Sequence, residues 1–183
     1  MSPKKLAFSS VFICFAAALS ALETMLPPIV PITGVRVGLG NVVTLLILYV
    51  GGRWRGADAL IVTVLRCVLA ALIVGSPMSA VYGICGGTAA WVAMLAAQRV
   101  FPKNPDNARP EAKFLPFTAV FGAVFHIAGQ MSAAVAFYGT RSVLAYTPIL
   151  LASAILGGLF TGFLTYLTLN KMPDKLLENI RNV

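Results

Sequence analysis

The chain alternates between long apolar runs and short connections rich in glycine, proline or charge. A helix that crosses a membrane needs about 20 largely apolar residues, and six runs come near that length. We expect the spans at residues 6–22, 36–50, 57–74, 78–98, 114–137 and 143–169. The pattern therefore predicts an all-α membrane protein, with residues 1–183 forming a single integral domain that is a bundle of six transmembrane helices.

Two of the connections have a character of their own. Residues 23–35 are apolar yet carry Pro27, Pro28, Pro31 and Gly34, and proline breaks helices. We interpret this stretch either as a lid loop that folds over the outer mouth of the bundle or as an ordinary interfacial loop. The polar residues 100–113 form the one long cytoplasmic connection.

Short segments elsewhere carry further predictions. Gly75, Ser76 and Pro77 are typical of a tight outer turn between two spans. After Pro173, residues 174–183 predict a short helix with Leu176, Leu177 and Ile180 on one side, lying along the inner membrane surface.

Composition agrees with a membrane setting, because 58% of the residues are hydrophobic and only 11% are charged, against about 25% in soluble domains. The net charge of +8 reflects topology rather than nucleic-acid binding. On one side of the predicted membrane lie Lys4, Lys5, Arg53, Arg55, Arg99, Lys103, Arg109, Lys113, Lys171, Lys175 and Arg181. The other side keeps only Arg36 and Arg141. Since positive residues favour the cytoplasmic side, we expect a multi-pass protein of the cell membrane with both termini in the cytoplasm and the first helix retained.

Several kinds of enzyme site lack their parts. The chain has one histidine, and its three cysteines, at positions 14, 67 and 85, have no CxxC spacing. Neither a Walker motif nor paired carboxylates nor an aspartate-rich diphosphate motif is present. We therefore expect no enzyme, no metal and no cofactor, and any ATP-driven step would need another subunit.

Polar side chains inside the predicted spans are the best candidates for function, because they are costly in a bilayer and usually face a cavity or one another. They are Glu23, Arg36, Asn41, Arg66, His126 and Gln130. Arg66 lies mid-span, so it either binds a ligand or pairs with Glu23 or a helix-end carbonyl. His126 and Gln130 share a helix face and either contact a ligand or are core residues. Arg36 could also be an interfacial anchor.

The outer half of the bundle would be positive if its charged residues share a cavity. Arg36, Arg66 and Arg141 outnumber the single acid Glu23 there, which favours an anionic or strongly polarised ligand. Tyr82, Phe137, Tyr138 and Tyr146 could wall such a cavity for a ring, although aromatic residues are common at membrane interfaces anyway.

These motifs resemble a known family. The runs Ala21-Leu22-Glu23, Gly34-Val-Arg-Val-Gly-Leu-Gly-Asn41, Leu65-Arg66 and Phe125-His126-Ile-Ala-Gly-Gln130 are similar to the Gx transporter family, also labelled heptaprenyl diphosphate synthase component I. That family resembles the substrate-binding (S) components of energy-coupling factor (ECF) vitamin transporters. The resemblance implies six helices, a ligand site near the outer face under a capping loop, and a coupling subunit with two ATPases as partners. It also implies partner docking on small residues of the first helix, here Ala17 and Ala21. Arg36 departs from the lysine that many relatives have.

Three functions follow as hypotheses. The first is a substrate-binding membrane subunit of an ECF-like importer for a small anionic or ring-containing vitamin, flavin or quinone-related compound. The alternative is a non-catalytic membrane component that recruits a prenyl diphosphate synthase or redox partner through residues 100–113 and the tail. The third, a self-contained secondary transporter, lacks visible inverted repeats.

Overall fold

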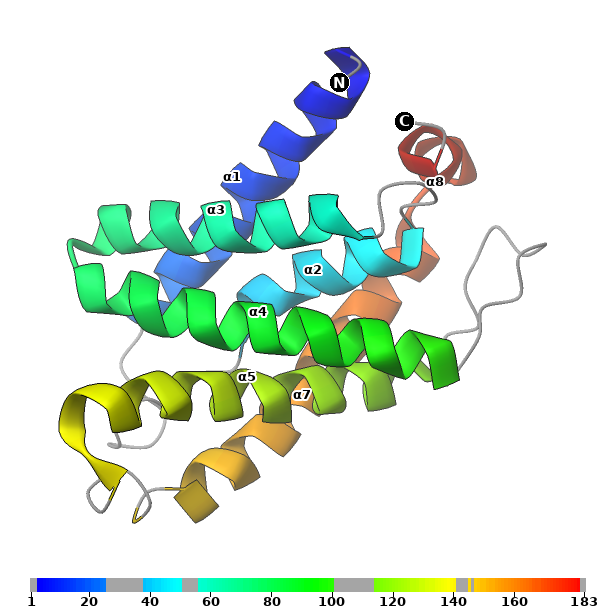
Figure 1. Ribbon diagram of the computed structural model, residues 1–183. Coiled ribbons are helices and arrows are strands. Elements are labelled where there is room, and N and C mark those ends of the chain that lie inside the picture. The colour runs from blue at the N-terminus through cyan, green and yellow to red at the C-terminus, as the bar shows by residue number, and fades with distance from the viewer. Residues whose placement is uncertain are drawn as a thin grey trace.

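The computed structural model describes residues 3–25, 38–50, 56–100, 114–140, 145 and 147–181. Helices make up nearly all of this part, and it contains no strand. In chain order they are α1 (Pro3–Met25), α2 (Leu39–Val50), α3 (Ala57–Val74), α4 (Pro77–Val100), α5 (Leu115–Tyr138), α7 (Thr147–Lys171) and α8 (Asp174–Arg181) (Figure 1). The prediction of an all-α bundle is confirmed.

Five of the described helices, α1, α3, α4, α5 and α7, are long and apolar enough to cross a membrane. The chain is therefore a multi-pass membrane protein. The predicted span 57–74 coincides with α3, and the other four predictions differ from these long helices by one to four residues at either end. The predicted span 36–50 corresponds to α2, whose 12 residues cover about 18 Å at 1.5 Å per residue.

The described α2 begins at Leu39, three residues later than predicted. Gly38 has a φ of 84°, a left-handed conformation that only glycine adopts without strain, and this interrupts helical geometry just before Leu39. Arg36, Pro27, Pro28, Pro31 and Gly34 lie outside the described residues, so the predictions for the lid loop and for Arg36 stay predictions.

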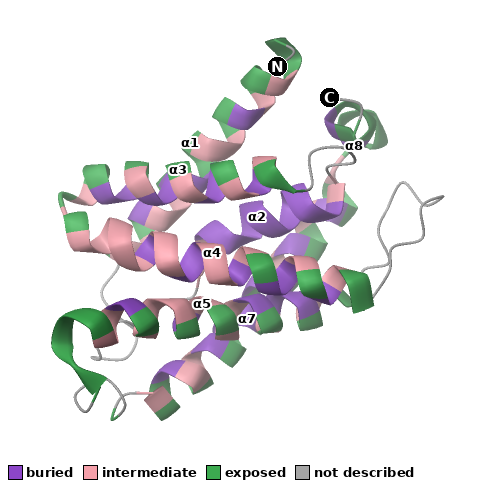
Figure 2. Cartoon of the chain, in the orientation of Figure 1, coloured by how far each residue is buried: buried purple, intermediate pink, exposed green. Residues whose placement is uncertain are grey.

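The short helix α2 is the centre of the bundle. Every residue from Gly40 to Tyr49 is buried, and α2 contacts α1, α3, α4, α7 and α8. Its sequence is apolar on all sides, which is what a helix surrounded by others requires. Figure 2 shows α2 as a buried element while the outer faces of its neighbours are exposed. In a membrane protein those exposed apolar faces meet lipid.

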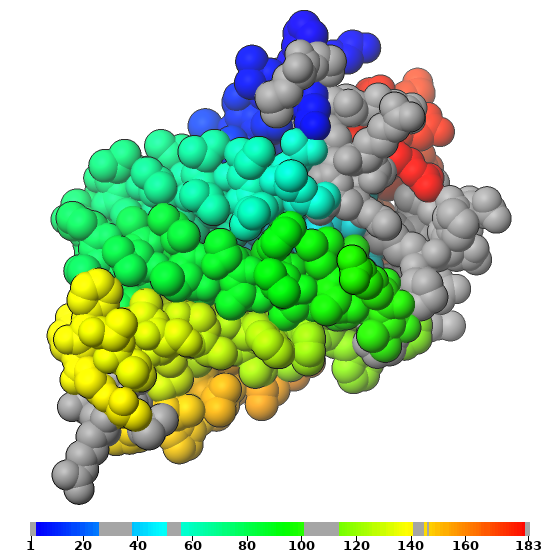
Figure 3. Space-filling model, in the orientation of Figure 1, coloured from blue at the N-terminus to red at the C-terminus, as the bar shows by residue number. Residues whose placement is uncertain are grey.

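Helices α3, α4 and α5 run side by side across one face of the molecule (Figures 1 and 3). The predicted turn between α3 and α4 is confirmed. Gly75 takes a left-handed conformation, and Ser76 N donates to Ala71 O at 3.0 Å, which closes the helix end. Pro77 then starts α4, where its missing N–H costs nothing.

Small residues let α5 and α7 approach closely. A Cβ on Gly158 would lie 2.6 Å from Val120 Cα, and one on Gly162 would lie 2.8 Å from Pro116 Cα. Gly83 in turn packs against Cys67, where a Cβ would be 3.1 Å from the Sγ atom. The regularly spaced small residues of these helices therefore make contacts within the chain.

A salt bridge joins α1 to α3. Lys5 Nζ lies 2.7 Å from Asp58 Oδ2, and this contact connects the first turns of the two helices.

The predicted tail helix is confirmed as α8, but its apolar side differs from the prediction. Leu177 and Ile180 are buried, and Leu177 belongs to the core cluster around α2, whereas Leu176 is 37% exposed. This face packs on the bundle itself.

Candidate functional site

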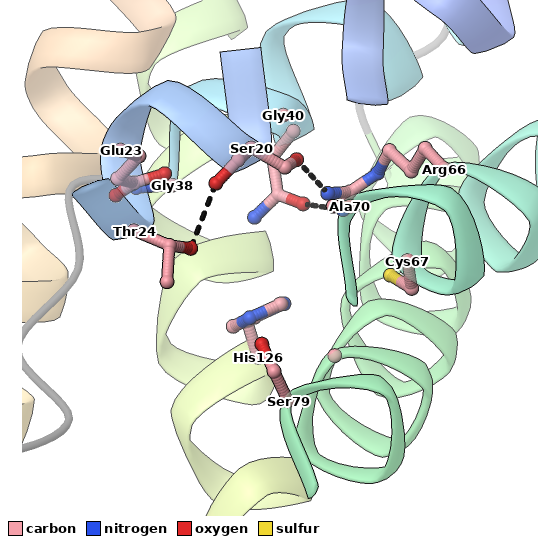
Figure 4. A pocket seen from close by; sticks show the side chains of 12 residues that line it. Ser20, Glu23, Thr24, Gly38, Gly40, Arg66, Cys67, Ala70, Ser79 and His126 are labelled. Carbon is pink, nitrogen blue, oxygen red and sulfur yellow. Dashed lines mark hydrogen bonds between the residues drawn. The ribbon is translucent and has the colours of Figure 1, made fainter. Parts of the chain in front are cut away.

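A pocket lies between five helices near the N-terminal end of α2 (Figure 4). Its cavity of about 30 Å³ has room for roughly two water molecules. Helix α1 contributes Ser20, Glu23 and Thr24; the start of α2 contributes Gly38, Gly40 and Asn41; α3 contributes Arg66, Cys67 and Ala70; α4 contributes Ser79 and Gly83; and α5 contributes His126.

Arg66 is the charged centre of this pocket. Its side chain is only 5% exposed. The Nη1 atom donates to Ser20 Oγ at 2.9 Å and the Nη2 atom donates to Asn41 Oδ1 at 2.7 Å. Both acceptors are neutral, and none of the described carboxylates pairs with Arg66. The buried Nε–H has no partner among the described residues. A buried cation without a counter-ion is costly, so the pocket favours an added negative charge.

The guanidinium reaches these partners because Gly40 has no side chain. A Cβ at position 40 would overlap Arg66 Nη1 and Ser20 Oγ and would lie 2.9 Å from Arg66 Cζ. The head of Arg66 thus lies across the backbone of α2 at Gly40. Gly40 thus accommodates an arginine from a neighbouring helix.

Glu23 was expected to bind ligand or to pair with Arg66, but its carboxylate has other partners. Gly38 N donates to Oε1 at 2.6 Å and Leu39 N donates to Oε2 at 3.0 Å. A carboxylate at the N-terminus of a helix satisfies free N–H groups and interacts favourably with the helix dipole. Glu23 therefore fixes α1 to the start of α2, and it lines the pocket with a charge that is already partly balanced.

The side-chain amide of Asn41 supplies a further hydrogen-bond donor near Arg66. Its Oδ1 atom accepts from the guanidinium, which orients the amide. The Nδ2 atom has no hydrogen bond among the described residues, and Asn41 lines the cavity. The residue is thereby able to donate to a ligand while it holds the arginine.

Of the six predicted residues, the structure brings together Glu23, Asn41, Arg66 and His126. The imidazole of His126 lies on the far side of the cavity from the Arg66 head (Figure 4). Gln130 does not line the pocket; it packs on α4, where its Cγ would lie 2.9 Å from a Cβ on Gly86. Their ligand roles stay predictions.

Ser20, Thr24 and Cys67 line the pocket but were not predicted. Ser20 lies three residues before Glu23 and four residues before Thr24, which places all three near one face of α1. This polar cluster at the end of an apolar helix was the available signal. Cys67 gave none, because a cysteine in an apolar span is usually a packing residue.

The predicted docking face of α1 is covered in this structure. Ala17 is 2% exposed and Ala21 is 4% exposed, and α1 packs against α2 and α3. A partner could reach Ala17 and Ala21 only if α1 moved away from the bundle. Docking there stays a prediction that requires such a movement.

The described residues contain no group of three histidine, cysteine, aspartate or glutamate side chains that could hold a metal ion. What the pocket does offer is a set of hydrogen-bond donors around one buried cation. This arrangement is suited to binding a hydrogen-bond acceptor group.

No curated protein and no solved structure matches the chain. A family model described as heptaprenyl diphosphate synthase component I matches residues 12–168. This range takes in α3, α4 and α5 in full, most of α1 and α7, and every residue that lines the pocket. The chain therefore belongs to the heptaprenyl diphosphate synthase component I family.

Proposed function

We propose that the chain is a non-catalytic membrane subunit that binds a small molecule in the pocket around Arg66, as the substrate-binding subunit of an ECF-like importer. The observation that carries this proposal is the environment of Arg66, a buried cation held by two neutral acceptors beside a cavity. The ligand would be an anionic or ring-containing vitamin, flavin or quinone-related compound. Energy would come from partners, a transmembrane coupling subunit and ATPases.

Ligand binding by the purified protein tests this proposal. Flavins, thiamin, menaquinone precursors and prenyl diphosphates would be tested in turn by the shift in unfolding temperature and by equilibrium dialysis. We expect saturable binding of one class and at least a tenfold weaker affinity in Arg66→Gln. Tyr49→Phe is a matched control. Tyr49 on α2 forms a buried hydrogen bond with Thr118 on α5, and it does not line the pocket. Absence of saturable binding across the panel would reject the importer.

The family description favours a second function more directly than the first. Its words name a component of a prenyl diphosphate synthase, and the chain would then be the non-catalytic component that brings a synthase or redox partner to the membrane. The exposed side of α8 carries the charged residues Lys175 and Glu178, which supports a partner surface on this helix. Residues 100–113 were expected to share in that surface.

A partner pull-down separates the two functions. Replacing residues 101–113 with a neutral linker of the same length, or reversing the charges of Lys175 and Glu178, would abolish capture of a synthase subunit if recruitment is the function. Arg66→Gln would leave that capture intact. The opposite pattern, with normal capture in the surface variants, would reject recruitment.

A further inference from the structure

We infer that the group recognised beside Arg66 is a single carboxylate, and that phosphate and diphosphate groups are rejected. This inference rests on the proposed binding function of the same pocket and names the chemistry of its ligand. Charge, size and available donors each support it.

The charges that line the cavity come closer to balancing one added negative charge than two. Arg66 supplies one positive charge with neutral partners. Glu23 supplies a negative charge that is engaged by the first N–H groups of α2, where the helix dipole contributes about half a positive charge. The lining therefore carries about half a positive charge, and a monoanion comes closer to balancing it than a dianion does. A phosphate dianion or a diphosphate would add further charge beside the Glu23 carboxylate, where burial makes like charges costly.

The cavity also suits a small planar group. Its volume of about 30 Å³ corresponds to roughly two water molecules, which the two oxygens of a carboxylate can replace. A phosphate carries four oxygens in a tetrahedron and is the larger group. The rest of a ligand would then extend away from the carboxylate, out of this cavity.

The donors match a carboxylate by exchange of partners. A carboxylate would compete with Ser20 Oγ and Asn41 Oδ1 for the guanidinium, and charge-assisted hydrogen bonds are about twice as strong as neutral ones. The guanidinium fork binds carboxylates, as it does phosphates, through two parallel N–H bonds, so the choice between them rests on charge. Its buried Nε–H is without a partner among the described residues. Asn41 Nδ2 can donate to the same group once Oδ1 is released.

The variant Asn41→Asp mimics the carboxylate-bound state of the pocket. It places a carboxylate within reach of Arg66 Nη2 at the position where Oδ1 now lies 2.7 Å away. We expect this variant to fold and to keep the arginine paired. We expect it to lose all response to added carboxylates.

The test uses the full chain in detergent with formate, acetate, inorganic phosphate and pyrophosphate, each against chloride at equal ionic strength. The first readout is the rate at which methyl methanethiosulfonate modifies Cys67, a buried pocket residue, in a Cys14→Ser, Cys85→Ser background. The second readout is the unfolding temperature, and it takes the place of the first if Cys67 proves unreactive. We expect formate and acetate to slow modification several-fold with saturation and to raise the unfolding temperature. Phosphate and pyrophosphate should match chloride, and Arg66→Gln should abolish the carboxylate effect.

Two results would overturn the inference. If phosphate or pyrophosphate protects as strongly as acetate in an Arg66-dependent manner, the ligand class is wrong while the binding function of the pocket stands. If Asn41→Asp responds to acetate as the wild type does, or if no carboxylate acts in either readout, the pocket does not take a carboxylate. The compound panel described above would still decide independently whether the chain binds a ligand of another kind.

Discussion

Replacing Gly40 with alanine should reveal how the pocket is held together. The new Cβ would overlap Arg66 Nη1 and Ser20 Oγ, so the guanidinium would have to leave its position across α2. It would then lose its hydrogen bonds to Ser20 and Asn41. Such bonds to charged groups contribute about 1.5–3 kcal/mol each, whereas the gain in helix propensity from glycine to alanine is about 1 kcal/mol. We therefore expect Gly40→Ala to lower the free energy of unfolding by about 2–5 kcal/mol.

Hydrogen bonds measured between membrane helices average only ~0.6 kcal/mol, because the polar groups find other partners in the unfolded chain. That lower value would let the gain in helix propensity nearly cancel the loss. Arg66 is a charged group without a carboxylate partner in the described structure, so the larger cost of an orphaned charge should apply here. The sign and size of the effect therefore measure how strongly Arg66 depends on its position.

The assay is reversible unfolding in mixed micelles by sodium dodecyl sulfate, followed by circular dichroism, on a double-mutant cycle. Without the arginine only the overlap with Ser20 Oγ remains, and rotation of that hydroxyl group can relieve it. Gly40→Ala in an Arg66→Ala background should therefore be neutral or stabilising by up to about 1 kcal/mol. Gly56→Ala is the control, because a Cβ there meets nothing within 4 Å, and its effect should stay within about 0.5 kcal/mol. Equal destabilisation by Gly40→Ala in both backgrounds would refute the reasoning.

Three further predictions concern the scaffold around the pocket. Glu23→Gln should cost about 1 kcal/mol, because it removes the charge that caps α2, and should speed hydrogen exchange of the first amides of α2; unchanged exchange would show that the cap is not needed. Tyr49→Phe should cost about 0.6–1 kcal/mol through loss of the bond to Thr118 at 2.9 Å, measured by the same unfolding assay, and a cost above about 3 kcal/mol would point to a larger network. Gly158→Ala should lower the unfolding free energy by several kcal/mol, because its Cβ would lie 2.6 Å from Val120 Cα and backbone must move; a neutral result would contradict the close packing of α5 on α7.

The long helices could be predicted from sequence because hydrophobic length alone determines them. Residues 57–74 illustrate this, since the apolar run, a glycine at each end and the following proline all indicate the same boundaries. The start of α2 could not be predicted in the same way. It depends on the left-handed Gly38 and on the carboxylate of Glu23, which is 15 residues away in the chain. Hydropathy carries no information about such a contact.

Only part of the composition of the pocket was predictable from the sequence, and its hydrogen bonds were not. A mid-span arginine had to face the interior of the bundle, and Arg66 does. Its partners were expected to be Glu23 or a helix-end carbonyl, but they are Ser20 and Asn41. The choice depends on which turn of α1 faces α3 and on the space above Gly40, and both are set by tertiary packing. The same packing covers Ala17 and Ala21, whose spacing alone is compatible with a contact inside the chain or outside it.

The most direct measurement is mass spectrometry of the small molecules that co-purify with the wild-type chain and with Arg66→Gln, prepared in parallel from the same host. An anionic molecule should accompany the wild type in near-equal amount and be lost from the variant, while circular dichroism reports the same helix content for both. If both proteins carry the same molecules in the same amounts, Arg66 does not bind the ligand.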